Sequence, residues 1–246
     1  MKNKGGLSLY ESDALSLVTG DTLRPGGFVL TDLGVKQCAF LPGDQVLDLG
    51  CGNGATVERL VSLYQLQATG LDASERLLEL GNHKHPGLDL IRGVGEELPF
   101  EADHMDGILC ECTLSVMDDL DQVLKEIFRV LKPGGRLVIQ DVYARNPEGL
   151  KPLKALNLDS CIRSALPKET YLDKLLAQGF NLIHWSDHTR LLTQLTVNLI
   201  MTHGSMAEFW LKSSSCSGSV DPILVQAAMK QAKMGYFQLI AQKDEN

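Results

Sequence analysis

The run Val46–Gly54 ends in glycines at every second position, Gly50, Gly52 and Gly54. Glycine has no side chain, so a turn of this kind lets the backbone approach a ligand closely. Apolar residues then recur at helical spacing over Ala55–Tyr64, which predicts a helix directly after the turn. A strand, a glycine turn and a helix in this order favour a nucleotide-type ligand held near the backbone amides at the start of the helix.

The glycine spacing alone does not identify the ligand. The first two glycines and Ala55 also satisfy the G-x-G-x-x-G/A spacing of dinucleotide-binding proteins. Three further features favour a different ligand. Asp48 comes just before the turn and gives D-x-G-x-G-x-G, and Asp72 closes a second apolar run, where a carboxylate can accept both hydroxyls of a ribose. Residues 130–139 then read as a helix end, a Pro-Gly-Gly turn and a strand.

Across roughly Leu41 to Asp141, these features in this order resemble the class I S-adenosylmethionine (SAM) methyltransferases. The resemblance is to methyltransferase domains of type 11 or 25 and to the quinone-biosynthesis methyltransferase group. It implies SAM as the cofactor and S-adenosylhomocysteine as its product. It also implies direct in-line transfer of the methyl group to a small-molecule acceptor, a reaction in which positioning does most of the work.

The resemblance also implies which residues bind the cofactor. The glycine turn passes beneath the methionine part of SAM, Asp48 meets its amino group directly or through water, and Asp72 binds the ribose. Two other interpretations stay open. Asp48 can bond nearby amides, and Asp72 can cap the helix that begins near Ser74, although Ser74 can serve as that cap itself. The full predicted set is Asp48, Gly50, Cys51, Gly52, Gly54, Asp72, Ala73, Gly95, Glu96 and Glu111.

The adenine pocket is expected in Arg92–Phe100, whose tail Glu-Leu-Pro-Phe matches the family. The chain departs from the family pattern at Val94, where most relatives carry an Asp that accepts the exocyclic amine of adenine. Valine cannot accept a hydrogen bond, so we expect the amide of Gly95 and the carboxylate of Glu96 to take over. The loss of one polar contact costs on the order of 1 kcal/mol.

Glu111 is the best polar candidate for a catalytic residue, because in relatives the end of the predicted strand 105–111 lines the meeting point of methyl donor and acceptor. It can hold the methionine end of SAM or orient a substrate; the alternative is a helix-capping acid on the surface. The nearby pair Cys110 and Cys112 has too short a spacing for a usual zinc site. We interpret both as small buried apolar residues and predict no metal site.

A second resemblance, weaker than the first, is to the arsenite methyltransferases. It rests on Asp159–Leu166, where Cys161 precedes a run ending in Ala-Leu. This similarity implies a metalloid bound by Cys161 and by Cys216 further along the chain, with Cys38 as a possible third ligand. Thiolates are the appropriate ligands for a thiophilic metalloid.

The overall composition favours a small-molecule substrate. With 23 basic and 31 acidic residues, the formal net charge of −8 disfavours a nucleic-acid partner. No apolar run is long enough to span a membrane, and the N-terminus lacks the apolar core of a secretion signal. Six cysteines without paired spacing favour reduced thiols and a cytoplasmic location. The sequence does not predict an oligomeric state.

Alternating apolar patterns predict a doubly wound α/β fold with a mostly parallel, seven-stranded sheet. Expected strands are 45–49, 67–72, 88–92, 105–111, 135–142, 180–186 and 234–242. Expected helices are 31–40, 54–64, 74–82, 119–131, 168–178, 189–203 and 220–232. Residues 1–41 are expected to form an N-terminal cap segment on a methyltransferase domain of residues 42–246, with insertions at 143–166 and 204–220 that complete a lid. The resemblance implies that the last strand is antiparallel.

Two other function classes remain compatible with the sequence. Val94 and the lack of a clear general base leave room for a non-catalytic SAM-binding protein. The dinucleotide-like spacing leaves room for a dehydrogenase. His184 and His188 have the i, i+4 spacing of metal ligands, but we expect them to straddle a strand end and a helix start.

Overall fold

The computed structural model describes residues 9–156, 160–213 and 221–245, and within these ranges one sheet contains seven strands. The strands are ordered β3-β2-β1-β4-β5-β7-β6 across the sheet. Their bounds are β1 Gln45–Leu49, β2 Gln67–Asp72, β3 Asp89–Arg92, β4 Met105–Glu111, β5 Leu131–Ala144, β6 Phe180–Asp187 and β7 Met234–Lys243. The predicted seven-stranded sheet is thus confirmed, with strand ends within a few residues of expectation.

Strands β1 to β5 are parallel to their neighbours, whereas β7 pairs antiparallel with both β5 and β6. The antiparallel orientation of the last strand is therefore also confirmed. The order of the parallel strands reverses between β1 and β4, because the chain leaves β1 toward β2 and later returns to β4 on its other side. Ligands of doubly wound sheets bind at such a point, beyond the carboxyl ends of the strands.

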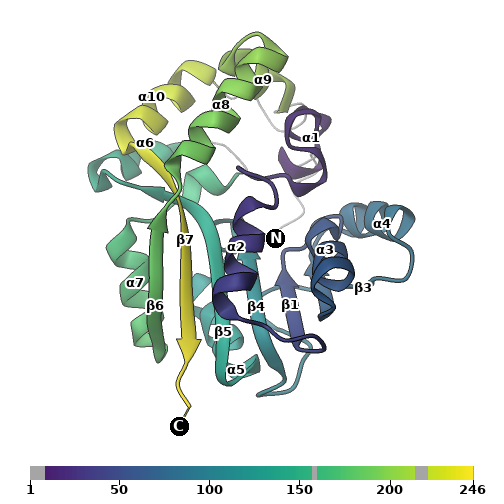
Figure 1. Ribbon diagram of the computed structural model, residues 1–246. Helices are drawn as coiled ribbons and strands as arrows, with labels where there is room; N and C mark the ends of the chain where they lie inside the picture. The colour runs from purple at the N-terminus through teal and green to yellow at the C-terminus, as the bar shows by residue number, and fades with distance from the viewer. Residues whose placement is uncertain (1–8, 157–159, 214–220, 246) are drawn as a thin grey trace.

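Helices cover both faces of the sheet (Figure 1). One face packs against α2 and α3 through a buried cluster that includes Val35, Val57 and Leu60. The other face packs against α5 and α7 through a larger cluster that includes Ile127 and Leu175. The helix bounds are α2 Val29–Cys38, α3 Ala55–Tyr64, α4 Glu75–Lys84, α5 Leu120–Val130 and α7 Lys168–Ala177.

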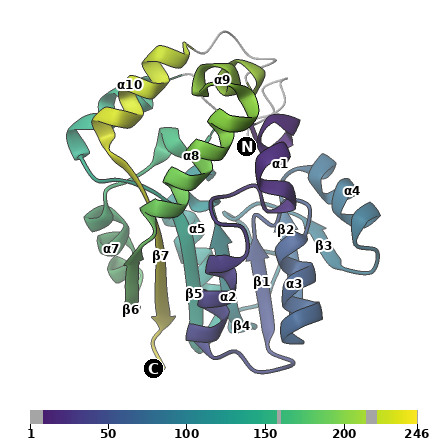
Figure 2. The ribbon, with the colours of Figure 1, turned by 45° about the horizontal axis from the view of Figure 1, so that its top comes forward.

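A group of helices lies across the end of the sheet at which the parallel strands finish (Figure 2). Trp210, Tyr236 and Phe209 are the largest side chains of its core, which is distinct from the cores on the two faces of the sheet. Of these helices the sequence predicted the two long ones, but it missed the three short ones. Their bounds are α1 Asp13–Thr19, α6 Leu150–Ala155, α8 Thr189–His203, α9 Met206–Ser213 and α10 Pro222–Ala232.

The short length of the three missed helices explains why the sequence pattern did not predict them. Helices α1, α6 and α9 have seven, six and eight residues, too few turns for a periodic apolar pattern to stand out. They are held by tertiary packing instead: α1 lies against α8 and α9, and α6 lies against α10. No helix in the described ranges is long and apolar enough to cross a membrane.

Candidate functional site

The glycine turn is held to the end of β2 by Asp72. One carboxylate oxygen of Asp72 accepts the amide N–H of Gly52 at 2.8 Å, and the other accepts that of Ser74 at 2.7 Å. Helix α4 is capped by the hydroxyl of Ser74, which accepts the amide N–H of Leu77. Asp72 is therefore not the N-cap of α4. Burial raises its pKa, and the two amide hydrogen bonds oppose that rise.

A pocket opens between this turn, the carboxyl ends of β1, β2 and β4, and the N-terminal segment. All but one of the residues predicted to bind the cofactor line it. The exception is Gly54, which starts α3 with φ of +77°, and whose added Cβ would lie 3.0 Å from the side chain of Leu90. Gly54 is therefore needed for the turn and its packing, away from the pocket wall. The predicted residues that do line the pocket are Asp48, Gly50, Cys51, Gly52, Asp72, Ala73, Gly95, Glu96 and Glu111.

Asp48 is buried at the pocket wall, with 2% of its surface exposed, and no residue in the described ranges forms a hydrogen bond with its carboxyl group. Burial raises the pKa of Asp48 well above its ordinary value, and the carboxylate of Glu111 raises it further. The cation of Arg24 opposes both effects. A buried carboxyl without a hydrogen-bond partner is costly, so Asp48 is poised to accept a donor, above all a cationic one, from a ligand.

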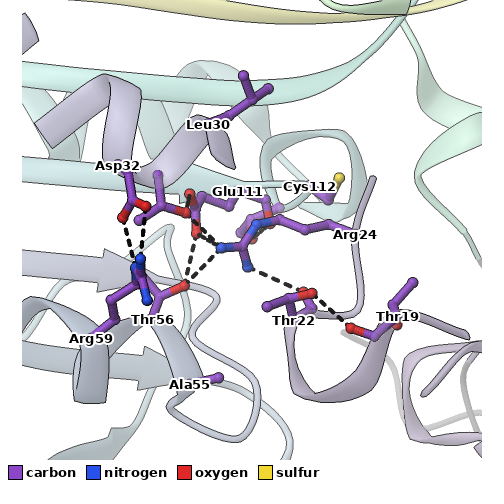
Figure 3. A network of polar contacts seen from close by, with 12 residues as sticks. Thr19, Thr22, Arg24, Leu30, Asp32, Ala55, Thr56, Arg59, Glu111 and Cys112 are labelled. Carbon is purple, nitrogen blue, oxygen red and sulfur yellow. Dashed lines mark hydrogen bonds and ion pairs between the residues drawn. The ribbon is translucent and has the colours of Figure 1, made fainter. Parts of the chain in front are cut away.

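Glu111 lies at the centre of a buried polar network (Figure 3). Its Oε2 is 2.7 Å from Nη2 of Arg24 and accepts the hydroxyl of Thr56 at 2.9 Å. Its Oε1 accepts the hydroxyl of Thr31 at 2.6 Å. Glu111 is thus a buried acid with both oxygens occupied, so the alternative interpretation as a helix cap on the surface is wrong.

The region expected to hold adenine lies on the pocket wall. Val94 and Gly95 both line the pocket, and Val94 is 38% exposed. One carboxylate oxygen of Glu96 accepts the amide N–H groups of Asp118 and Asp119, at 3.0 and 3.2 Å. Glu96 therefore fixes the loop that leads into α5. No described residue forms a hydrogen bond with its second oxygen, which is therefore able to contact a ligand.

The charges around the pocket distinguish between the two nucleotide-type ligands. Along its described wall stand seven acidic side chains and a single basic one, that of Arg24, which is already paired with Glu111. The pyrophosphate of a dinucleotide would meet this acidic wall without a free cation. SAM carries a sulfonium and an ammonium group against one carboxylate, so its net positive charge fits the wall. The acidic residues are Glu11, Asp21, Asp48, Asp72, Glu96, Glu111 and Asp118.

Cys110 and Cys112 are both buried, as expected, whereas the arrangement around Cys161 differs from expectation. Cys110 packs in the core beneath α5, whereas Cys112 packs in the core of the helices at the end of the sheet. The thiol of Cys112 forms a hydrogen bond with the hydroxyl of Tyr236, at 3.4 Å, and the neighbouring thiol of Cys161, together with burial, raises the pKa of Cys112 well above its ordinary value. Cys38 lies near the amino ends of β4 and β5, so the expectation that it joins Cys161 is wrong. Cys216 falls outside the described residues.

His184 and His188 belong to different elements. His184 lies in β6 and His188 immediately precedes α8, as expected, with its Nε2 2.8 Å from the hydroxyl of Ser186. Among the residues that the structure describes, no group of three or more His, Cys, Asp or Glu side chains is arranged to hold a metal ion.

Comparison with known proteins agrees with the fold. Residues 47–139 match the profile of a family described as a methyltransferase domain. The 2-phytyl-1,4-naphtoquinone methyltransferase of Synechococcus elongatus is 34% identical over 135 residues, which cover 52% of this chain and 58% of that protein. The demethylmenaquinone methyltransferase of Lysinibacillus sphaericus is 34% identical over 127 residues, 48% of this chain and 53% of that protein. The chain thus spans about half the length of the curated relatives it matches.

Solved structures show the same fold. Phosphoethanolamine N-methyltransferase 2 of Haemonchus contortus, in complex with SAM, aligns with a TM-score of 0.74 at 19% identity, covering 98% of this chain and 59% of that one. The [4+2]-cyclase SpnF aligns with a TM-score of 0.68 at 23% identity, covering 88% and 81% of the two chains. Residues 47–139 are a methyltransferase domain of the class I, SAM-dependent type. The cofactor of this class is SAM, in agreement with the resemblance noted in the sequence.

Sequence reasoning missed the most buried cation of the site. Arg24 has 6% of its surface exposed, yet the sequence analysis assigned it no role. One signal was available: between residues 5 and 35, Arg24 is the only basic residue. Its partners Thr31 and Thr56 gave no such signal, because threonine is common at helix starts and on helix surfaces.

Proposed function

We propose that this protein transfers the methyl group of SAM to a small-molecule acceptor. The observation that carries the proposal is the buried Asp48 beside the glycine turn, with which no described residue forms a hydrogen bond, in a pocket whose described wall is acidic. Asp48 would accept the ammonium group of the cofactor. Asp72, already set by two amides, would accept the ribose hydroxyls, and Gly95 and Glu96 would border the adenine.

The chain's own contribution to the reaction would be positioning. SAM supplies an activated methyl group with a good leaving group, so an acceptor held in line needs little further chemistry from the protein. Glu111 was the best sequence candidate for a catalytic acid or base. Arg24, Thr31 and Thr56 occupy the two carboxylate oxygens of Glu111. We therefore assign Glu111 a structural role, in which it holds together the residues at the floor of the pocket.

A transfer assay tests this proposal. The protein is incubated with methyl-labelled SAM and deproteinised cell extract, and separately with a reduced naphthoquinone that lacks its ring methyl, because both curated relatives described above are named for quinones. Label in an organic product is expected from the wild-type protein and from Asp89→Asn, an exposed control on β3. Asp72→Asn is expected to lose it.

The assay also separates the rival functions. If calorimetry shows SAM binding but no label is transferred to the cell extract or to the naphthoquinone, the methyltransferase proposal is overturned in favour of a non-catalytic SAM-binding protein. The [4+2]-cyclase among the solved structures shows that this fold is not restricted to proteins named as methyltransferases. Binding of NADH in place of SAM would favour a dehydrogenase.

One observation favours a second candidate, a thiophilic metalloid as methyl acceptor. Cys112 lines the cofactor pocket, and its thiol contacts Cys161, whose backbone N–H donates to the hydroxyl of Tyr10 at 3.1 Å. Two neighbouring thiols can condense with a trivalent metalloid hydroxide, forming two sulfur–metalloid bonds and releasing two water molecules. The pair is Cys112 and Cys161, in place of the Cys161 and Cys216 expected from the sequence.

The metalloid candidate is tested by adding arsenite and a thiol to the same assay. Label in an arsenical that disappears in both Cys112→Ser and Cys161→Ser, but persists in Cys38→Ser at the far end of the sheet, would support it. Labelled organic product that forms equally in all variants and without arsenite would exclude it and leave the first proposal intact.

A further inference from the structure

Four of the helices at the end of the sheet, α6, α8, α9 and α10, are called the cap helices below, and they expose apolar side chains to solvent. Six of the fifteen large apolar side chains that are exposed in the described ranges belong to them. Met201 of α8 and Ile223 of α10 are the two most exposed of the fifteen, at 81% and 75%. Single exposed apolar residues are ordinary, but a group of them on neighbouring helices indicates an interaction surface. The other four are Val197, Ile200, Leu211 and Leu224.

The cap helices form one continuous part of the molecule. Helix α9 packs against both α8 and α10, and α10 packs against α6. Figure 2 shows α8, α9 and α10 together at the end of the molecule. Their inward-facing side chains, among them Leu199, Phe209 and Val225, already form the core between these helices. The exposed apolar side chains are therefore not needed for that packing, and they are available to a partner.

This part of the chain is basic, although the protein as a whole is acidic. Residues 145–166 and 188–233 contain the cap helices and carry eight basic and four acidic residues, a net charge of +4. The rest of the chain carries 15 basic and 27 acidic residues, a net charge of −12. The cap helices therefore lie in a positively charged part of a negatively charged protein.

The basic side chains of these two segments are also free to attract a partner. All eight are exposed, among them Lys151 and Lys154 of α6 and Lys230 of α10, and none forms an ion pair with a described residue. The ion pairs between described residues all take their basic partner from the rest of the chain. The positive charge of the cap helices is thus not neutralised by the described part of the protein.

We propose that the cap helices bind the surface of a membrane that contains anionic lipids. Exposed apolar side chains can enter the headgroup region while lysine and arginine attract anionic headgroups, and surfaces that combine the two bind a membrane without crossing it. The charge argues against a second copy of this chain on the same surface, because a two-fold contact would bring two positive surfaces together.

The cap helices also adjoin the cofactor pocket. Tyr10, Leu23 and Cys112 line the pocket and pack in the core of the helices at the end of the sheet. A membrane bound at the cap helices would therefore lie on the side of the protein at which the pocket is built. That this would bring a lipid-dissolved acceptor toward the cofactor rests on the proposed function; the binding itself does not.

The test is cosedimentation of the full chain with lipid vesicles. One set contains phosphatidylcholine with a quarter of phosphatidylglycerol, which is anionic, and the other contains phosphatidylcholine alone. We expect the wild-type protein to bind the anionic vesicles at least tenfold more tightly than the neutral ones. We also expect high salt to weaken this binding, because salt screens the attraction between exposed charges.

Two sets of substitutions separate the apolar from the basic contribution. Met201→Ser/Ile223→Ser is expected to lower the affinity for anionic vesicles at least fivefold. Lys151→Gln/Lys154→Gln/Lys230→Gln is expected to lower it at least tenfold, because each basic residue near an anionic surface adds to the binding. All five side chains are exposed, so thermal unfolding should show little change in stability.

Matched control variants change the same number of exposed residues outside the cap helices. They are expected to bind anionic vesicles within twofold of the wild-type protein. The apolar control is Leu41→Ser/Leu63→Ser, and the basic control is Lys36→Gln/Arg76→Gln/Lys125→Gln.

Wild-type protein that does not sediment with anionic vesicles would overturn the inference, as would equal losses in the cap variants and their controls. A dimer in analytical ultracentrifugation that dissociates in Met201→Ser/Ile223→Ser, without vesicle binding, would instead assign this surface to a second copy. The measurement requires neither SAM nor an acceptor. Its failure would therefore leave the proposed function standing, and failure of the transfer assay would leave this inference standing.

Discussion

A Cβ atom added to Gly50 would lie 2.2 Å from the Oγ1 of Thr113, at the point where the turn after β1 meets the chain leaving β4. Gly50 also has φ of +80°, which L side chains rarely adopt. Gly50→Ala therefore combines a clash with backbone strain, and we expect it to lower the free energy of unfolding by roughly 3 kcal/mol in urea titrations.

The control for this substitution is Gly20→Ala. Gly20 also has a positive φ, +62°, but an added Cβ would meet nothing within 4 Å. We expect it to cost about 2 kcal/mol, through backbone strain alone. Equal losses of stability in the two variants would mean that the contact with Thr113 contributes nothing.

Asp72→Asn is expected to weaken SAM binding at least tenfold. The carboxylate accepts the amides of Gly52 and Ser74 on its two oxygens, and an asparagine would turn an N–H₂ group toward one of these donors. The turn would lose one of its restraints, and the ribose would lose a charged acceptor. Asp89→Asn, with a hydrogen bond to Thr69 on the outer strands, is the control in the same titration. An affinity unchanged within threefold would contradict the role of Asp72.

Binding of SAM is expected to weaken as the pH falls. Burial and Glu111 raise the pKa of Asp48 in the free protein, so lowering the pH protonates Asp48 at values where an ordinary aspartate is still charged. The cationic cofactor requires the charged form, so binding in that range releases a proton. Calorimetry in buffers of different ionisation enthalpy would detect this release, and Asp48→Asn should abolish it. A release that persists in Asp48→Asn would assign the proton to another group.

The stability of the fold should also depend on pH, through Asp141. Burial raises its pKa from 3.8 to about 6, although Ser115 donates two hydrogen bonds to its carboxylate. The folded chain thus holds a proton that the unfolded chain has lost, and stability falls as the pH rises from about 4 to about 6. The loss is on the order of 3 kcal/mol.

Urea unfolding at pH 4 and pH 7 measures this loss. Asp141→Asn cannot titrate, so its stability should change less between the two pH values than that of the wild-type protein. The other carboxyl groups contribute equally to the pH dependence of both proteins. The contribution of Asp141 is therefore the change in unfolding free energy of the wild-type protein between the two pH values minus that of Asp141→Asn. A difference near zero would show that Asp141 keeps an ordinary pKa.

The sequence predicted the sheet well because most of its strands carry a short apolar run, such as Ile108–Cys110 in β4 and Leu137–Ile139 in β5. It also placed the carboxylates of Asp48 and Asp72 at strand ends, which determines which pocket they line. The contacts of Glu111 were not predictable, because they depend on Arg24, which lies 87 positions earlier in the chain. The pairing of Cys112 with Cys161 was missed for the same reason: only the packing of the helices at the sheet end brings them together.

The ion pair between Arg24 and Glu111 also limits how this protein can be recombined with its relatives. The region shared with the family begins at residue 47, so a natural crossover for a chimera would lie between residues 24 and 47. Such a chimera keeps Glu111 of this protein, but its residue at position 24 comes from the other parent protein. A donor without an arginine at that place would leave the carboxylate buried and alone, a defect of about 3–5 kcal/mol. Arg24 and Glu111 must therefore be kept together in a chimera, although the domain boundary predicted from the sequence, at residue 41, separates them.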